Sequence, residues 1–396
     1  MKKICLLAFS GGLDTSYCAI YLKKQGYELH TITVDTGGFS QKELKEIEEK
    51  AYELGSVSHV NESIVEEFYQ KAIKYLIAGN ILKNNSYPLS VSAERMFQAM
   101  AIAKHANKIS ATYLAHGSTG AGNDQVRFDM AFNILCPEIE IITPIRDQKL
   151  SREEEIAFLK ENGVDIDWKK AQYSINQGIW GTSVGGSETL TSDKNLPDHA
   201  WPDQAKATED LEISIAFEKG EPCALNGIAY DATTLIGKLN DLGKDYAIGR
   251  DIHVGDTVIG IKGRVGFQAS AAIMLIKAHE QLEKHVLGKW QIYWKKQLAE
   301  WYGNLLHDGQ YLDPVMRDIE SFIDSSQKTV SGEVFISLKP HRFIIKGISS
   351  KHDLMQSDDG VYGEMNNAWT GQDVKGFTKI LSNPSKIWYN KNKELV

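Results

Sequence analysis

The stretch that decides the fold is Leu7–Ser16, LAFSGGLDTS. It continues an apolar run, Ile4–Phe9, that predicts a buried strand, and it ends that run at Ser10-Gly11-Gly12. Asp14 and Thr15 then begin a helical pattern. Adjacent glycines let the backbone turn tightly and approach a ligand, and a helix start presents unpaired N–H groups with partial positive charge. A strand, a glycine turn and a helix start predict a phosphate-binding site.

The kind of phosphate loop follows from its spacing. No Gly-Lys pair in the chain is followed by Ser or Thr, so a Walker loop is excluded, and the adjacent glycines do not fit a GxGxxG dinucleotide turn. Two glycines alone also suit a plain turn, but Ser10, Asp14, Thr15 and Ser16 surround them here. The string SGGLDTS resembles the signature of the N-type ATP pyrophosphatases, the PP-loop family. The resemblance implies that ATP is attacked at its α-phosphate and releases pyrophosphate.

Strand and helix patterns alternate after this loop. Because alternation of this kind builds parallel sheets, we predict an α/β fold with a doubly wound, mostly parallel sheet. An α+β second domain and a C-terminal helical extension are expected to follow. The predicted strands are Ile4–Phe9, Glu28–Val34, Val57–Val60, Thr112–Ala115 and Ile139–Thr143, and the predicted helices are Thr15–Lys24, Ser40–Leu54, Ile64–Ile77, Ala93–Ala106 and Ser151–Gly163. The end of the second strand, at Val34, is where an adenine is expected to lie.

A second glycine-rich loop, His116–Arg127 (HGSTGAGNDQVR), also follows a strand. Thr119, Asn123 and Asp124 place short hydrogen-bonding side chains on it, which suits the amino group of an amino acid. Asn123 and Arg127 are four residues apart and would share one face of a helix, where Arg127 could hold a carboxylate. The alternative is a solvated turn with Arg127 in a surface salt bridge.

The two loops together are similar to those of the argininosuccinate synthase family, a PP-loop group. Leu114–Phe128 closely follows the family's second loop, and Tyr87–Arg95 keeps the Tyr, Ser and Arg of its citrulline loop. Weaker matches are Tyr173–Asn176, Ser183, Gly249–Arg250 and Ile259–Arg264. The resemblance implies that a citrulline oxygen attacks ATP to give citrullyl-AMP and pyrophosphate, and that the aspartate amine then displaces AMP. It also implies a homotetramer, in which subunits of the family exchange their tails.

The resemblance also implies which residues carry each role. Those expected to bind ATP are Ala8, Phe9, Ser10, Gly11, Gly12, Leu13, Asp14, Thr15, Ser16, Val34 and Gly117. Those expected to bind aspartate are Thr119, Asn123 and Asp124, and those expected to bind citrulline are Tyr87, Ser92, Asn123, Arg127, Ser174 and Ser183. Asp14, Asp124 and Arg127 are assigned to the chemistry, and Asp14 is a candidate ligand of Mg²⁺. His116 is the nearest candidate for a general base and equally a candidate structural histidine.

The chain departs from the family pattern at three positions. Ala121 stands where the second loop often has a lysine. The citrulline-contacting Glu and Tyr of the family align with Gly255 and Phe267. Asp256 and His253 are candidate replacements for the missing acid, and both remain open at this point. The chain therefore resembles a divergent branch of the family.

Bulk composition limits the alternatives. A chain of 396 residues suggests two domains and an extension, which we place at 1–167, 168–362 and 363–396. The net charge of −8 argues against a wide nucleic-acid surface. Four scattered cysteines without a CxxC indicate no zinc or iron–sulfur site, and Cys5 and Cys18 are expected in the core. No signal peptide or membrane span is evident, so a cytoplasmic protein is expected.

The second half gives coarser expectations. A helix over Leu287–Leu305 carries Trp290, Trp294 and Trp301 as a bulky stripe, which suits core packing or a subunit interface; the family resemblance favours the interface. The remaining expectations are a loop over Trp180–Trp201, a hairpin of Leu211–Phe217 with Ala224–Tyr230, a strand-rich Val258–Ile276, a strand over Val334–Ile345 and an extension over Asn366–Val396 with one short helix.

Two other functions remain open. A tRNA-modifying PP-loop adenylase would usually carry basic patches or reactive cysteines, and this chain has neither a positive net charge nor a CxxC. A non-catalytic nucleotide sensor would need no second loop for an amino acid. The two amino-acid substrates, ATP and Mg²⁺ are therefore the expected partners, without nucleic acid or membrane.

Overall fold

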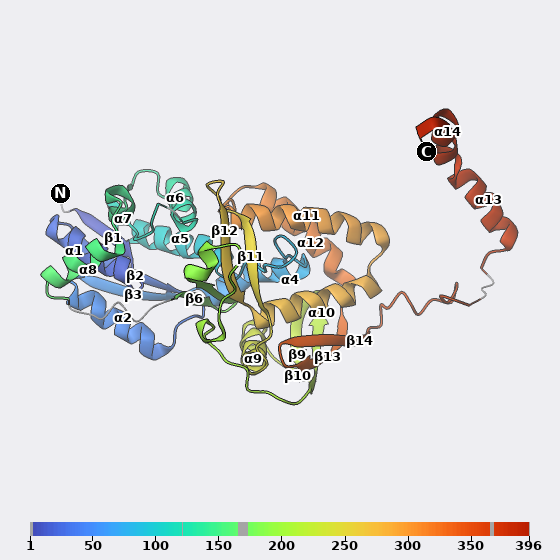
Figure 1. The fold of residues 1–396 in the computed structure, drawn as a ribbon, viewed down its shortest axis with the longest axis horizontal. Helices are drawn as coiled ribbons and strands as arrows, with labels where there is room; N and C mark the ends of the chain where they lie inside the picture. The colour runs from blue at the N-terminus through green and yellow to red at the C-terminus, as the bar shows by residue number, and fades with distance from the viewer. Residues whose placement is uncertain (1–2, 121, 165–172, 365–367, 396) are drawn as a thin grey trace. The chain divides into compact units, whose positions relative to one another are not determined.

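The computed structural model describes residues 3–120, 122–164, 173–364 and 368–395. The chain separates into two compact units, one up to Lys351 and one from His352 onward. Figure 1 follows the chain through both. Three sheets account for all the named strands of the described residues, and all three belong to the first unit.

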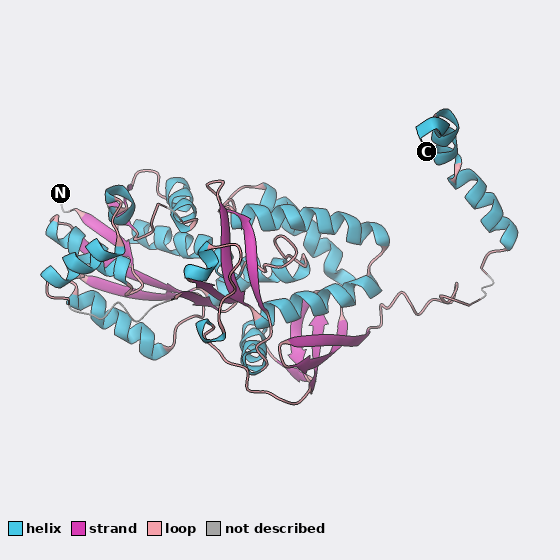
Figure 2. Cartoon of the chain, in the orientation of Figure 1, coloured by secondary structure: helices cyan, strands magenta, loops and turns pink. Residues whose placement is uncertain are grey.

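The first sheet is parallel and carries the glycine loops at its edge. Its strand order is β3-β2-β1-β4-β5, with every neighbouring pair parallel, so the predicted doubly wound sheet is confirmed. Figure 2 shows helices packed around these strands. The strands are β1 (Ile4–Ala8), β2 (Glu28–Asp35), β3 (Ser58–Ser63), β4 (Tyr113–Ala115) and β5 (Glu140–Ile142).

The helices of this part begin where the sequence provides caps. Ser40 and Ser151 each close a capping box with the glutamate three residues later, as predicted. The predicted helix over Ile64–Ile77 is interrupted by a π-helical turn, Tyr69–Ile73. The helices are α1 (Leu13–Lys24), α2 (Gln41–Glu53), α3 (Val65–Phe68), α4 (Lys74–Ala78), α5 (Ser90–Lys108), α6 (Asp124–Leu135), α7 (Pro144–Gln148) and α8 (Arg152–Glu161).

Two antiparallel sheets and four helices follow, which confirms the α+β second part. One sheet has the order β11-β12-β7-β6 and the other the order β10-β9-β8-β13-β14. In Figure 1, β11 and β12 lie between the parallel sheet and helices α10 to α12. The strands are β6 (Ser174–Gly178), β7 (Gly181–Gly185), β8 (Leu211–Glu218), β9 (Glu221–Leu225), β10 (Ile228–Ala229), β11 (Arg250–Asp256), β12 (Lys262–Gln268), β13 (Gly332–Lys339) and β14 (Arg342–Ser349). The helices are α9 (Ala232–Asp245), α10 (Ser270–Val286), α11 (Lys289–His307) and α12 (Val315–Ser326).

Two predicted strands are each split by a turn. Leu211–Phe217 does form the predicted hairpin, but its partner begins at Glu221 and ends at Leu225. Asn226-Gly227, with both φ angles positive, turns the chain into β10. The strand predicted over Val334–Ile345 is likewise wrong, because a turn with His341 at positive φ separates β13 from β14.

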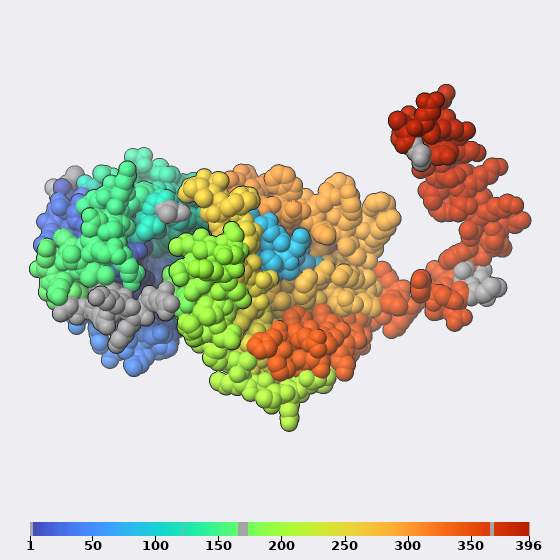
Figure 3. All heavy atoms as spheres, viewed as in Figure 1, coloured from blue at the N-terminus to red at the C-terminus, as the bar shows by residue number. Residues whose placement is uncertain are grey.

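Two other expectations are only partly right. Val258–Ile276 is strand-rich only up to Gln268; from Ser270 it is α10, whose first turns contain the continuous apolar run Ala271–Ile276. An apolar run of this kind does not distinguish a buried helix from a strand. The loop predicted over Trp180–Trp201 contains β7. Its remainder lies against β12, because Arg264 donates to the carbonyls of Glu188 and Lys194. In Figure 3 the green atoms of this part of the chain adjoin the yellow atoms of the β11–β12 region.

The tryptophan stripe on α11 is not core. Trp290, Trp294 and Trp301 are 65%, 54% and 64% exposed in the chain. The buried face of the helix instead carries residues such as Lys295, Ala299, Tyr302 and Leu306. The core-packing interpretation is therefore wrong.

The second unit contains α13 (Gly371–Leu381) and α14 (Asn383–Lys391), two helices where one was predicted. Neither helix has a buried residue. The predicted division between residues 167 and 168 lies outside the described residues. In the described parts of the chain, no helix has both the length and the apolar character that a membrane crossing needs.

Candidate active site

The first loop has the backbone of a phosphate site. Gly11 has φ +71°, which favours glycine, and Gly12 begins α1 in an extended conformation without a side-chain cap. The Ser16 hydroxyl donates to the Gly12 carbonyl at 2.7 Å and anchors the turn. The Ser10 and Thr15 hydroxyls lie 3.4 Å apart across the loop. The first N–H groups of α1 are therefore not taken by a cap and face the turn.

The two glycine loops meet. They follow β1 and β4, which are parallel neighbours in the sheet. A Cβ on Gly117 would lie 3.2 Å from the Cβ of Asp14 and 3.3 Å from the backbone nitrogen of Thr15. A side chain at position 117 would therefore press on the start of α1, whereas glycine leaves room for this close approach. Both loops therefore open at one edge of the sheet.

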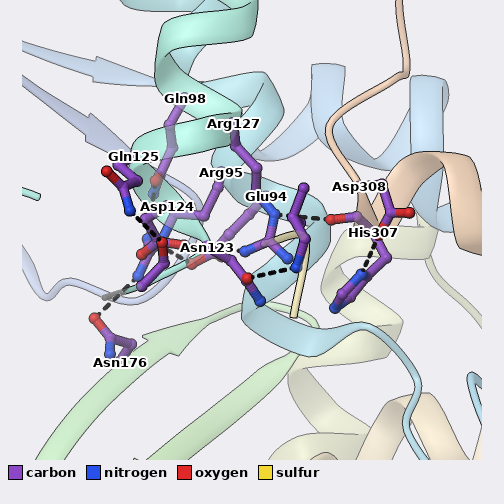
Figure 4. A network of polar contacts seen from close by, with 12 residues as sticks. Glu94, Arg95, Gln98, Asn123, Asp124, Gln125, Arg127, Asn176, His307 and Asp308 are labelled. Atoms are coloured by element: carbon purple, nitrogen blue, oxygen red, sulfur yellow. Dashed lines mark hydrogen bonds and ion pairs between the residues drawn. The ribbon is translucent and has the colours of Figure 1, made fainter. Parts of the chain in front are cut away.

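A charged network starts at the second loop (Figure 4). Asp124, the first residue of α6, accepts from Arg127 Nη1 through Oδ1 and from Arg95 Nε through Oδ2, each at 3.0 Å. Burial raises the pKa of the Asp124 carboxyl, but Arg95 and Arg127 outweigh it and hold that pKa below its usual value. Asp124 is therefore an anion that also orients two guanidinium groups. The interpretation of Arg127 as a surface salt bridge is wrong, because its side chain is only 3% exposed.

Polar atoms without partners identify where a ligand fits. Arg127 donates through Nε to the His307 carbonyl at 2.9 Å, yet its Nη2 is buried without a hydrogen-bond partner among the described residues. The Ser92 hydroxyl, in the first turn of α5, is also buried and unpartnered within the described chain. Buried donors of this kind are costly unless something binds them.

The antiparallel sheet β11-β12-β7-β6 faces these helices. Directly paired residues of antiparallel strands share a face, and Asn176, Ser183 and Phe267 are paired across three neighbouring strands. Asn176 accepts from Arg95 Nη2 at 2.9 Å, which joins this face to the charged network. Ser174, two residues from Asn176, lies on the same face. The sheet therefore brings Ser174 and Ser183 toward the second loop.

The other residues predicted to bind ATP or an amino acid differ in their burial and contacts. The Tyr87 ring is buried between His253 and Phe267. Asn123 accepts from the Val258 backbone at 2.9 Å, so the β11–β12 turn reaches the second loop. Thr119 is exposed, whereas Val34 is buried at the end of β2.

Asp14 has a contact that the sequence did not indicate. Its carboxyl lies in hydrogen-bonding reach of Glu155, which is buried on α8. Burial and the nearby Asp14 carboxyl raise the pKa of Glu155 to about 8, and burial raises the pKa of Asp14. Glu155 is therefore the carboxyl of this pair that keeps its proton near neutral pH.

The carboxylates near the phosphate loop determine how the chain could bind Mg²⁺. Mg²⁺ commonly takes one or two carboxylates together with substrate phosphates and water. Within the described residues, no three acidic, His or Cys side chains gather to hold a metal ion. Asp14 is half-buried at the phosphate loop, and the neighbouring Glu155 has its pKa raised to about 8, so Asp14 is the carboxylate that this pair offers a metal at neutral pH.

His116 has structural contacts at both ring nitrogens. Nε2 bonds Asp129 at 2.9 Å, and Nδ1 accepts from the Ser118 backbone at 3.2 Å. The ring also stacks on Phe128. This favours the structural interpretation over a general base.

Several side chains of the site were missed. Arg95 was noted only as part of a matching segment, and its pairing with Asp124 depends on α5 packing against α6. Glu94 is buried, accepts from Thr36 at 2.7 Å, and has its pKa raised by burial to about 7. Lys50 donates to the Gly11 carbonyl at 2.6 Å from α2. A charged residue inside an apolar helical pattern was the available signal for Glu94.

Comparisons with known proteins agree with this geometry. Residues 3–165 match the family model "Arginosuccinate synthase N-terminal HUP domain", and residues 173–388 match "Arginosuccinate synthase C-terminal domain". The argininosuccinate synthase of Xanthomonas campestris is 36% identical over 404 residues, covering 99% of this chain and 100% of the relative. That of Methanocaldococcus jannaschii is 37% identical over 342 residues, covering 85% and 86%, and that of Pyrococcus furiosus is 35% identical over 390 residues, covering 97% and 94%. The resemblance seen in the two loops is confirmed: the chain belongs to the argininosuccinate synthase family.

Proposed function

We propose that this chain joins citrulline to aspartate with ATP, giving argininosuccinate, AMP and pyrophosphate. The observation that carries the proposal is the meeting of the two loops, with Gly117 against Asp14 and the unpartnered Arg127 nitrogen on the adjoining helix. A phosphate site and an amino-acid site then share one edge of the sheet. Neither alternative, a tRNA-modifying adenylase or a nucleotide sensor, explains an amino-acid site there.

The reaction needs activation because a ureido carbon resists attack by an amine. The citrulline oxygen attacks the α-phosphorus of ATP, and the bond to pyrophosphate breaks. The aspartate nitrogen then attacks the ureido carbon, AMP leaves with the former ureido oxygen, and the nitrogen loses its proton to a product phosphate. The protein contributes positions and fixed charges rather than a covalent intermediate. Ser10 to Ser16 receive the departing pyrophosphate through backbone N–H groups and hydroxyls.

The two amino acids are held by the second loop and the facing sheet. The aspartate amino group binds the Asp124 carboxylate, with Thr119 and Asn123 beside it. Arg127 Nη2 donates to the citrulline carboxylate, and Tyr87, Ser92, Ser174 and Ser183 line the rest of that site. Because Asp124 also orients Arg127, the two amino-acid sites are coupled. Mg²⁺ neutralises phosphate charge when bound, with Asp14 as the nearest loop carboxylate.

The test is pyrophosphate release from ATP, measured with each amino acid alone and with both. The proposal expects full turnover only with citrulline and aspartate together, and formation of argininosuccinate in equal amount. Release without either amino acid, or none with both, would contradict it. Release that requires tRNA would favour the adenylase instead.

We further propose a homotetramer in the cytoplasm, with the domain limits given by the sequence. The exposed aromatic residues of α11 support an interface on that helix, because a solvated helix rarely carries three tryptophans. The helices of the second unit carry exposed apolar residues such as Phe377, Ile380 and Trp388, which supports exchange of this tail between subunits.

A further inference from the structure

We propose that His253 is a specificity-determining residue that receives the α-amino group of citrulline, in the space where the family has a glutamate. This inference rests on the proposed function, in which His253 was given no role. His253 lies on β11, in the part of the sheet that faces Tyr87.

The strand register places His253 at the site. His253 and Gly255 are two residues apart, so their side chains point to the same face of β11. Both are buried, whereas Val254 and Asp256 between and beyond them are exposed. The His253 ring stacks on Tyr87, with ring centroids 4.8 Å apart, and Tyr87 also packs on Phe267. Phe267 carries no hydroxyl, so it offers no polar contact there.

His253 fills the space above Gly255. A Cβ built on Gly255 would lie 2.7 Å from His253 Nε2 and 3.1 Å from the Asn84 side-chain nitrogen. A side chain at position 255 would therefore force the imidazole of His253 to move from its present position. The glycine at position 255 leaves room for the imidazole of His253 in its present position.

His253 also has an unused polar atom. Its Nδ1 is buried without a hydrogen-bond partner in the described part of the chain, as are the Ser92 hydroxyl and Arg127 Nη2. Asp256, the other candidate replacement, is on the exposed face of β11 and pairs with Lys262 at 2.7 Å. The structure therefore favours His253.

The surroundings keep the imidazole neutral. Burial lowers the pKa of His253 to about 4, together with smaller lowering effects of His307 and Lys83 and against the opposing effect of Asp251. A neutral ring nitrogen accepts a hydrogen bond from an ammonium group. At pH values near 4, protonation of the ring would repel the ammonium, so the KM for citrulline should rise as the pH falls.

The experiment compares four variants by steady-state kinetics of pyrophosphate release. His253→Ala should raise the KM for citrulline about tenfold to a hundredfold, the loss of one charge-assisted hydrogen bond, and leave the KM for ATP within about twofold. His253→Gln keeps a neutral acceptor and should stay close to the parent. Gly255→Glu should also raise the KM for citrulline, because its Cβ meets the imidazole.

The double variant His253→Ala/Gly255→Glu decides the matter. It removes the imidazole and places a carboxylate in the vacated space, so the KM for citrulline should return to within severalfold of the parent. A KM at least as high as that of the worse single variant would overturn the proposal, as would a His253→Ala KM equal to that of the parent. His105→Ala, a half-buried histidine on α5, is the matched control and should change nothing. A parent protein without citrulline-dependent release would instead overturn the proposed function, and this inference with it.

Discussion

Replacing Asp124 with asparagine tests the centre of the site. The substitution keeps the shape of the side chain and removes its charge. In the structure this carboxylate bonds Arg95 and Arg127, each at 3.0 Å, and we assign to it the aspartate amino group. The variant therefore loses a charged partner for the substrate and leaves two guanidinium groups less well oriented.

The magnitude follows from the contacts. Truncating one partner of a buried charged hydrogen bond costs about 2–5 kcal/mol, but the Asp124 side chain is 41% exposed, so solvent screens it. We take about 2 kcal/mol, which corresponds to an increase of roughly 30-fold in the KM for aspartate. The KM for citrulline should rise about threefold to tenfold, because Arg127 keeps its bond to the His307 carbonyl.

The assay is pyrophosphate release with each substrate varied in turn. The KM for ATP should stay within about twofold, since Asp124 has no part in the phosphate loop. Asp241→Asn, an exposed carboxylate on α9 paired with Lys244, is the control and should leave all three constants unchanged. An unaltered KM for aspartate, or an equal rise for ATP, would refute the assignment.

Three other perturbations address stability, pH and assembly. Glu283→Gln removes the partner of buried Lys295, whose Nζ lies 2.9 Å from Glu283 Oε1, with both side chains no more than 3% exposed. The free energy of unfolding in urea should fall by about 3–5 kcal/mol, and a loss below about 1 kcal/mol would contradict a charged pair. Glu155 binds its proton more tightly when folded, with a pKa of about 8 against 4.5, so its stabilisation is complete below pH 4.5 and lost as the pH rises to 8. Glu155→Gln should remove the part of the fall in unfolding free energy that Glu155 causes between pH 4.5 and 8, and an unaltered pH profile of unfolding would contradict the raised pKa of Glu155. Trp294→Glu should dissociate the proposed tetramer in sedimentation velocity without altering the circular dichroism of the subunit; an intact tetramer would place the interface elsewhere.

The parallel sheet was predictable because its signals are local. Gly11 and Gly12 end a strand, and Ser40 and Ser151 form caps with residues three positions later, so each feature is visible within a short window. The later errors have local causes as well. The turn at Asn226-Gly227 was overlooked within an apolar run, and α10 begins with the continuous apolar run Ala271–Ile276, which does not distinguish a helix from a strand.

The two glycine loops of the site could be predicted from the sequence, but the hydrogen bonds and ion pairs between its side chains could not. Asp124 could be assigned a charge from the sequence, but its pairing with Arg95 depends on how α5 packs on α6. The contact between Asp14 and Glu155 joins residues on α1 and α8, and no spacing in the sequence relates them. His253 was one of two candidates, and only the strand register separates it from Asp256. Such side-chain relations between distant elements require coordinates.

The wall that faces the second loop is assembled from strands far apart in the chain. β7 pairs with β12, but β8, β9, β10, α9 and β11 lie between these two strands in the chain and are synthesised first. Pairing of this kind has to close a long loop, which slows folding relative to local contacts. A nascent chain that has emerged only as far as β7 thus has a complete phosphate loop but lacks the His253 side of the amino-acid site. Nucleotide binding can mature first on the ribosome, and ligase chemistry has to wait for the downstream strands.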